Sequence, residues 1–196
     1  MMSSRIPKTF FAVPTVQLAK DLLGCVLMRE TETGRMAGTI VETEAYTEDD
    51  AASHSFGGRR TKRNAMMFAS AGHAYVYVSY GIHHCLNIVS ESMGQGCAVL
   101  IRAVMPTEGI AQMRKNRGDV SDTLLTNGPG KLCQAFGITG EHNGIDMTDA
   151  GSPLYVVPRE EKAISIRATP RIGITKAKSK KYRFLRKEQP HNRPSH

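Results

Sequence analysis

The segment from residue 73 to residue 80 restricts the possible fold most, because its side chains alternate between two sets. Small and branched apolar residues alternate with tyrosines and a serine, in the order Ala74, Tyr75, Val76, Tyr77, Val78, Ser79. A two-residue period sends alternate side chains to opposite faces and predicts a strand. Tyr80-Gly81 should end this strand, and further strands are expected at residues 85–90 and 97–104, joined by a turn at 93–96. Strands joined by hairpin-length turns predict a largely antiparallel sheet.

Helices and further strands complete the pattern. The other expected strands cover residues 25–29, 37–46, 154–157 and 164–174, with a turn at 30–34 and mostly loop at 47–71. The expected helices run from an N-cap at Thr15 to Gly24, from a cap at Thr107 to about Gly118, and within 129–136 up to Gly137. Strand and helix do not alternate as a doubly wound sheet requires, so we expect one α+β domain over residues 1–186. Residues 187–196 are expected to form a disordered tail.

Composition excludes several classes of protein. The chain has 196 residues, of which 40% are hydrophobic, enough to build the core of one domain. No run approaches the ~18 apolar residues of a membrane span, and the N-terminus lacks an apolar signal core, so we expect neither membrane insertion nor secretion. The four cysteines form no C-x-x-C pair and the histidines no i, i+4 pair around an acid. We therefore expect free thiols in a reducing compartment, with no metal and no cofactor.

Charge is distributed unevenly along the chain. Lys and Arg number 26 against 18 Asp and Glu, a net charge of +8. One basic cluster comprises Arg59, Arg60, Lys62 and Arg63, and every charged residue from 167 to 187 is basic. A single basic run is usually a solvated face, but two separated clusters in one domain favour binding to nucleic-acid phosphate.

Acidic residues also gather, at Glu42, Glu44, Glu48, Asp49 and Asp50. In a polyanion-binding protein such a cluster calls for a reason, and one reason is a carboxylate that acts as a general base near a scissile bond. An acidic strand end and loop facing water explains the cluster equally well. The two-residue period places Glu42, Glu44 and Tyr46 on one face. A carboxylate beside an aromatic ring suits a pocket for an extruded base, although an exposed sheet edge could carry the same pattern.

Seven blocks of sequence then occur in a recognisable order. They are residues 38–46 (GTIVETEAY), His54-Ser55, Arg63-Asn64 with Met67-Phe68, residues 75–87 (YVYVSYGIHHCLN), residues 100–103 (LIRA), residues 127–132 (NGPGKL) and Arg171-Ile172-Gly173. The ordered set resembles the alkyladenine (3-methyladenine) DNA glycosylase family from about residue 10 to residue 174. The resemblance implies a single mixed domain around a curved antiparallel sheet with a protruding hairpin, in agreement with the predicted elements.

The resemblance implies a catalytic pair. Glu44 matches the family's general base, which activates the water that attacks C1′ of the sugar, and Arg102 matches the arginine that helps to hold this water and the carboxylate. An alkylated purine is already a good leaving group, so one carboxylate suffices where glycoside hydrolases use two. No lysine Schiff base is involved, and the expected product is an abasic site without strand cleavage.

The resemblance also implies a base pocket. Tyr46, His54 and Tyr77 match the aromatic residues that sandwich the flipped base, and His54 would also read the edge of that base. Asn87 matches the residue that crowds the 2-amino group of normal guanine. Tyr80 matches the hairpin tyrosine that enters the minor groove and fills the space left by the flipped nucleotide. Tyr75 is expected to pack in the sheet, and Glu42 to be structural.

The partner implied is double-stranded DNA that contains a damaged purine, and we expect a monomer. Arg59, Arg60, Arg63 and Lys131 are candidate phosphate contacts, with loop scaffolding an equal alternative for Arg63. Such an enzyme would act in the cytoplasm at the nucleoid of a prokaryote, or in the nucleus of a eukaryote. A non-catalytic nucleic-acid-binding module and a small-molecule hydrolase with a basic surface are the competing hypotheses.

Two segments depart from the family pattern. The loop at residues 47–50 lacks the usual glycine and is one residue short, so the register between Tyr46 and His54 depends on the Ala-Ser-His-Ser match. The segment from Ala177 lacks the family's Pro-Trp, so no contacts of the tail are carried over.

Overall fold

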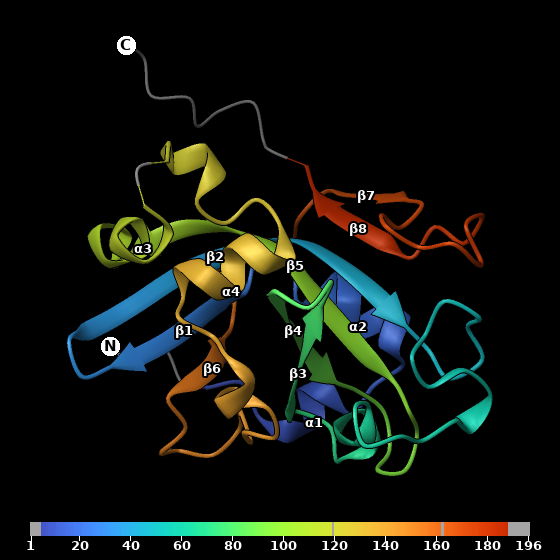
Figure 1. The fold of residues 1–196 in the computed structure, drawn as a ribbon. Coiled ribbons are helices and arrows are strands. Elements are labelled where there is room, and N and C mark those ends of the chain that lie inside the picture. Colours follow the sequence, from blue (N-terminus) through green and yellow to red (C-terminus); the bar gives the residue numbers. More distant parts are fainter. Residues whose placement is uncertain (1–4, 119, 162, 188–196) are drawn as a thin grey trace.

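The computed structural model describes residues 5–118, 120–161 and 163–187. Its main feature is one antiparallel sheet that curls into a half-barrel (Figure 1). The strands are β1 (Val26–Thr31), β2 (Gly34–Tyr46), β3 (Ala74–Ser79), β4 (His83–Val89), β5 (Ala98–Glu108), β6 (Leu154–Val157), β7 (Ile166–Thr169) and β8 (Arg183–Arg186). Their order is β3-β4-β5-β2-β1-β6, with β8 paired to β2 and β7 paired to β8. The predicted α+β domain with a curved antiparallel sheet is confirmed.

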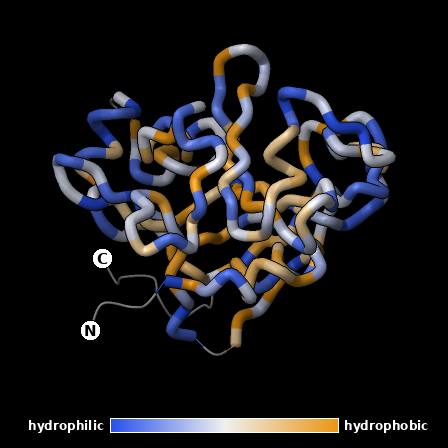
Figure 2. The backbone as a smooth tube through the Cα atoms, turned by 90° about the horizontal axis from the view of Figure 1, so that it is seen from below, coloured by the Kyte–Doolittle hydropathy of each residue, from blue (hydrophilic) through white to orange (hydrophobic). Residues whose placement is uncertain are grey.

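Short helices pack on this sheet. They are α1 (Lys8–Phe11), α2 (Thr15–Asp21), α3 (Ile110–Arg117) and α4 (Pro129–Ala135), with single 3₁₀ turns η1 (Phe56–Gly58), η2 (Ala65–Phe68), η3 (Asp122–Leu124) and η4 (Gly140–His142). Leu18 and Leu22 at α2, and Leu132 and Phe136 at α4, are fully buried in the main core. Apolar segments accordingly concentrate inside the body in Figure 2, and polar segments form the outer loops. Among the described residues, no helix is long and apolar enough to cross a membrane.

Two predicted helix caps are wrong. Pro14 is the N-cap of α2, whose first residue is Thr15, and the Thr15 side chain bonds instead to Ser90 and Glu91. Thr107 lies inside β5, which continues to Glu108. Gly109 is the N-cap of α3 and has a positive φ of 74°. A Cβ there would lie 2.4 Å from the Arg35 carbonyl oxygen, so this close approach of helix and strand requires glycine.

The predicted strand at residues 164–174 is also wrong over most of its length. β7 covers only Ile166–Thr169, because Pro170 has no N–H to donate to the ladder. The following strand, β8, was not predicted because its residues read as part of the basic run. The tail predicted at residues 187–196 lies outside the described residues, apart from Lys187.

The hairpin of β3 and β4 stands out from the body as a narrow loop at the top of Figure 2. Its turn contains Tyr80 at φ 51° and Gly81 at φ 75°, both in the left-handed region that suits a tight hairpin turn. Tyr80 is 86% exposed and Ile82 is 74% exposed. The hairpin therefore presents two large exposed side chains at a projecting tip, where the described part of the chain leaves them largely uncovered.

Candidate active site

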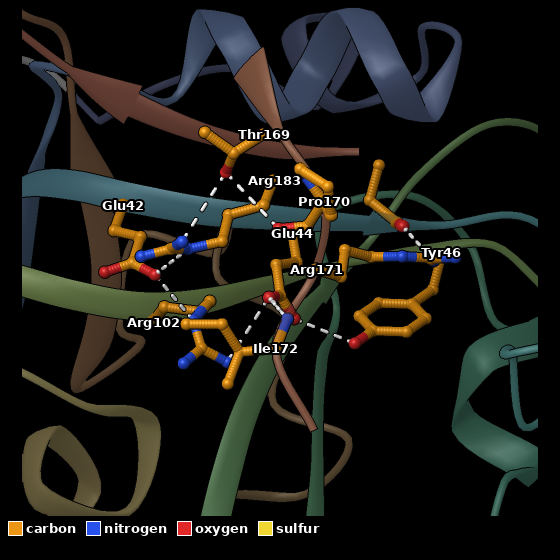
Figure 3. A network of polar contacts seen from close by, with 10 residues as sticks. Glu42, Glu44, Tyr46, Arg102, Thr169, Pro170, Arg171, Ile172 and Arg183 are labelled. Atoms are coloured by element: carbon orange, nitrogen blue, oxygen red, sulfur yellow. Dashed lines mark hydrogen bonds and ion pairs between the residues drawn. The ribbon is translucent and has the colours of Figure 1, made fainter. Parts of the chain in front are cut away.

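Glu44 lies in the second half of β2 and is fully buried. Its Oε2 atom accepts a hydrogen bond from the Tyr46 hydroxyl at 2.8 Å, and its Oε1 atom accepts one from the Ile172 amide at 2.9 Å. The Arg102 guanidinium adds an ion pair, with Nη1 3.4 Å from Oε1. Figure 3 shows these three groups converging on the carboxylate. A buried carboxylate with this many donors is held in one orientation, as a general base requires.

A second carboxylate, Glu42, holds the arginines around Glu44. Its Oε1 atom accepts from Arg102 Nε at 2.7 Å and from Arg183 Nε at 2.5 Å, so Glu42 joins β5 to β8. Burial acts to lower the pKa of Arg102, but the carboxylates of Glu44 and Glu42 outweigh it and raise that pKa. The expected structural pairing of Glu42 is present, with two cations and two anions alternating across the site.

Sequence reasoning did not foresee the loop that follows β7. Pro170 ends the strand, and the next two residues turn over the end of β2 (Figure 3). Arg171 Nη1 donates to the Ala45 carbonyl at 2.8 Å, and its Nη2 lies 2.6 Å from Asp50 Oδ2 in an ion pair with both side chains fully buried. This anchor brings the Ile172 amide to Glu44. The resemblance had included Arg171, but nothing in the local pattern indicates that Asp50 is its partner.

Aromatic rings form the wall beside the carboxylate. His54 and Tyr77 meet edge to face with ring centroids 4.7 Å apart, and Tyr75 lies 5.5 Å from Tyr77. The Tyr75 hydroxyl and His54 Nδ1 are 3.0 Å apart, so Tyr75 orients the imidazole in addition to packing in the sheet. Two guanidinium groups lie over the tyrosines, Arg171 at 4.6 Å from the Tyr46 centroid and Arg63 at 5.4 Å from that of Tyr77.

The pKa values of these rings are shifted by their surroundings. Burial, and then the neighbouring Glu44 carboxylate, raises the pKa of Tyr46, so its hydroxyl stays protonated and donates to Glu44. Burial likewise raises the pKa of Tyr77, and raises that of Tyr75 to about 12. Part of His54 is exposed, but burial of its ring lowers the pKa of the imidazole, and the nearby Arg63 charge lowers it further. Both effects favour the neutral imidazole.

A cavity of about 550 Å³ joins these groups. The predicted site residues that line it are Glu44, Arg102, Tyr46, His54, Tyr77, Asn87, Tyr80 and Arg63. Asn87 is nearly buried, and its Nδ2 donates to the carbonyls of Tyr75 at 3.0 Å and Cys85 at 3.4 Å. The cavity volume is in the ~300–1,000 Å³ range of small-molecule sites. Eight predicted site residues, from five separate stretches of sequence, thus line one cavity.

The other candidate phosphate contacts lie outside the cavity lining. Arg59 and Arg60 are exposed, and Arg60 lies over the Phe68 ring at 5.5 Å. Lys131, at α4, donates to Asn127 Oδ1 at 2.9 Å. Contact of these residues with phosphate stays a prediction.

The loop at residues 59–64 is tied to the rest of the site. Arg63 donates to the Val78 carbonyl at 2.9 Å, and therefore fastens the loop to the hairpin. Asn64 is buried and donates to the carbonyls of His54 and Arg59, both at 2.8 Å, which makes it a scaffold of the loop.

The late basic run is partly neutralised within the fold. Arg171, Lys180, Arg183 and Arg186 each form an ion pair with a carboxylate of this chain. Exposed members include Arg167, Lys176, Lys178, Lys181 and Lys187. Some residues of the run therefore form ion pairs within the fold, and others form an exposed basic surface. The sequence alone suggested one uniform surface.

The fold and the site define a class of protein with an aromatic-lined pocket beside the buried, fixed Glu44 carboxylate. A known protein family matches the chain along most of its length. The profile of the family described as Methylpurine-DNA glycosylase matches residues 9–190. The chain belongs to the methylpurine-DNA glycosylase family. It is a hydrolase that acts on N-glycosyl bonds in DNA, an enzyme of DNA repair.

Individual relatives agree with this membership. A protein of Rhodopseudomonas palustris (strain BisB18) is 46% identical over 183 residues, which cover 93% of this chain and 88% of the relative. One from Methanoculleus marisnigri is 47% identical over 186 residues, covering 93% and 95%, and one from Carboxydothermus hydrogenoformans is 45% identical over 183 residues, also covering 93% and 95%. All three carry the name "Putative 3-methyladenine DNA glycosylase".

Proposed function

We propose that the protein is a monofunctional glycosylase of base excision repair. It turns an alkylated or deaminated purine out of duplex DNA and hydrolyses the N-glycosidic bond, leaving an abasic site. The proposed lesion is 3-methyladenine, the base in the names of the relatives, with 7-methylguanine, hypoxanthine and ethenoadenine as further candidates. The observation that carries the proposal is the fully buried Glu44 carboxylate at the edge of a cavity lined by Tyr46, His54 and Tyr77.

In the proposed reaction, Glu44 takes a proton from water as the water oxygen bonds to C1′, and the purine leaves with the electron pair of the C1′–N bond. An oxocarbenium-like sugar develops positive charge, which the adjacent carboxylate stabilises. Tyr46 keeps its proton and holds one carboxylate oxygen, and Ile172 and Arg102 contact the other. No covalent attachment of the sugar to the protein is needed, so the strand stays intact.

The pocket and the hairpin support base extrusion. Unstacking a base costs a few kcal/mol, least for a damaged or mispaired base. Stacking on an aromatic side chain returns about 1–3 kcal/mol per base. The exposed Tyr80 ring, at the tip of a projecting hairpin and on the cavity rim, suits insertion between base steps. A cationic purine gains further from aromatic faces.

Duplex oligonucleotides that each carry one of the four lesions test the proposal. We expect alkali-labile sites from at least one lesion, and intact strands before alkali. Glu44→Gln should abolish base release while binding of the lesion duplex is retained, because the isosteric amide cannot take the proton. Glu32→Gln, the same change in an exposed turn, should leave release unaffected. Base release by Glu44→Gln at the wild-type rate would refute the proposed mechanism.

A further inference from the structure

Glu42 contacts Arg102 more closely than the buried Glu44 does. Arg102 Nε donates to Glu42 Oε1 at 2.7 Å, whereas its Nη1 lies 3.4 Å from Glu44 Oε1, an ion-pair distance longer than a normal charged hydrogen bond. Both the Arg102 and the Glu42 side chains are largely enclosed, at 12% and 15% exposure. The position of the guanidinium is therefore set mainly by Glu42.

The backbone of β2 fixes where Glu42 lies. The pairing of β2 with β5 changes register on both sides of Glu42, between Ile40 and Glu42 and again between Glu42 and Thr43. On its other edge β2 pairs with β8, and Arg183 comes from this strand to share the same Glu42 oxygen. Irregularities of this kind redirect side chains beside functional sites. Glu42 is thus held between two strands and two guanidinium groups.

We propose that Glu42 is a positioning residue of the glycosylase: it holds the Arg102 guanidinium back from Glu44, so that the Glu44 carboxylate stays available to water. The inference rests on the proposed function of Glu44. Arginine and a carboxylate in contact tend to form a two-pronged pair that occupies both oxygens. Oε1 and Oε2 of Glu44 each already accept one hydrogen bond, from Ile172 and Tyr46. A full pair with Arg102 would take the remaining acceptor positions that water needs.

Glu42 also balances the charge of the site. Glu42 and Glu44 together carry two negative charges against the two positive charges of Arg102 and Arg183. Removal of the Glu42 charge leaves an excess positive charge beside the sugar, where positive charge develops in the transition state. Both effects of losing Glu42, the closer Arg102 and the excess charge, slow bond cleavage without removing any group that would contact the bound base.

Three variants separate this role from a structural one. Glu42→Gln keeps the size of the side chain and removes its charge, and Glu42→Asp keeps the charge on a shorter side chain. Arg186→Gln is the matched control, because it breaks an ion pair to Glu161 from the same strand, β8, by a residue outside the cavity lining. Each variant is measured for single-turnover release of hypoxanthine and 7-methylguanine, for binding to a duplex with a tetrahydrofuran abasic analogue, and for thermal unfolding.

For Glu42→Gln we expect the single-turnover rate to fall roughly 10- to 100-fold, the usual effect of a misplaced active-site group, with analogue binding unchanged. The loss should appear with both neutral hypoxanthine and cationic 7-methylguanine, because positive charge develops on the sugar with either base, and Glu42→Asp should recover part of the rate. Arg186→Gln should keep its rate. A wild-type rate in folded Glu42→Gln, or an equal loss of rate in Arg186→Gln, would overturn the inference.

The controls also separate this inference from the proposed function. A wild-type protein that releases no lesion, or an active Glu44→Gln, contradicts the proposed function itself. An active wild type, an inactive Glu44→Gln and an unimpaired Glu42→Gln contradict only the role of Glu42.

Discussion

Replacing Asp50 by asparagine tests the buried ion pair that holds the loop over Glu44. The Asp50 and Arg171 side chains are both fully buried, with Oδ2 and Nη2 2.6 Å apart. Asparagine keeps the Oδ1 acceptor that binds the Ala52 amide at 2.9 Å, so the turn after β2 stays satisfied. The substitution therefore removes the negative charge and replaces the Oδ2 acceptor that faces Arg171 by an NH2 donor.

The expected loss of stability follows from the surroundings of Arg171. Removing one partner of a buried ion pair costs about 3–5 kcal/mol, because the other charge stays buried without compensation. Arg171 keeps its bond to the Ala45 carbonyl and its place over the Tyr46 and Tyr182 rings. Because cation–π contacts of this kind contribute ~0.5–2 kcal/mol, we expect a loss of stability at the lower end of the ~3–5 kcal/mol range, about 3 kcal/mol. For a domain of this size, that corresponds to a fall in Tm of roughly 6–12 °C.

Urea unfolding at neutral pH, followed by far-ultraviolet circular dichroism, measures the change directly, and a thermal scan gives the Tm. Asp122→Asn is the control, because its pair with Arg114 has side chains 54% and 55% exposed, and such pairs contribute at most ~1 kcal/mol. If Asp50→Asn unfolds within ~1 kcal/mol of the wild type, the reasoning that this pair anchors the loop is refuted.

Two further predictions concern the backbone and the pH dependence. Gly109→Ala should destabilise the protein by well over ~1 kcal/mol, because a Cβ would lie 2.4 Å from the Arg35 carbonyl oxygen. The control Gly118→Ala meets open space and should show only the cost of its positive φ. Equal urea midpoints for the two variants would contradict this prediction. Burial, and then Arg63, lowers the pKa of His54 from 6.5. The unfolded chain therefore binds a proton more readily than the folded one, so stability is complete above pH 6.5 and falls as the pH drops toward the folded pKa. His54→Gln should flatten this part of the pH profile of unfolding free energy, and parallel profiles would show that His54 does not contribute.

Local patterns predicted the strands up to β6 well, and predicted the last two strands and two helix starts poorly. The alternation before Tyr80 predicted β3 within a residue at each end, and β6 occupies the predicted residues 154–157. Threonine caps failed because the packing of neighbouring elements decides where α2 and α3 begin. Thr15 contacts Glu91, which lies in the turn after β4, and Gly109 is required by the approach of Arg35. These are distant contacts that a short window of sequence does not contain.

The structure brings the predicted site residues together around one cavity, and their roles stay predictions. Ordered motifs identified Glu44 and Arg102, and the structure places both beside one cavity. The loop that carries the Ile172 amide to Glu44 was not predicted, because no local sequence pattern indicates that Asp50 pairs with Arg171. Arg183 appeared in the sequence as one member of a basic run, and only the pairing of β8 with β2 shows that it neutralises Glu42. Residue types thus led to a hypothesis about the chemistry, and tertiary contacts determine which charged side chains pair within the structure.

The C-terminal strand has a consequence for the order in which the site is built during synthesis. β8 pairs with β2 beside Glu44, and the Glu42–Arg183 contact spans 141 residues of chain. The amide that binds Glu44 comes from Ile172, which lies 128 residues later. A nascent chain that ends before these residues has Glu44 on an uncovered strand edge, without its amide donor. The contacts of Glu44 and Glu42 are therefore completed only after Ile172 and Arg183 have been synthesised, and a shorter nascent chain lacks the completed site.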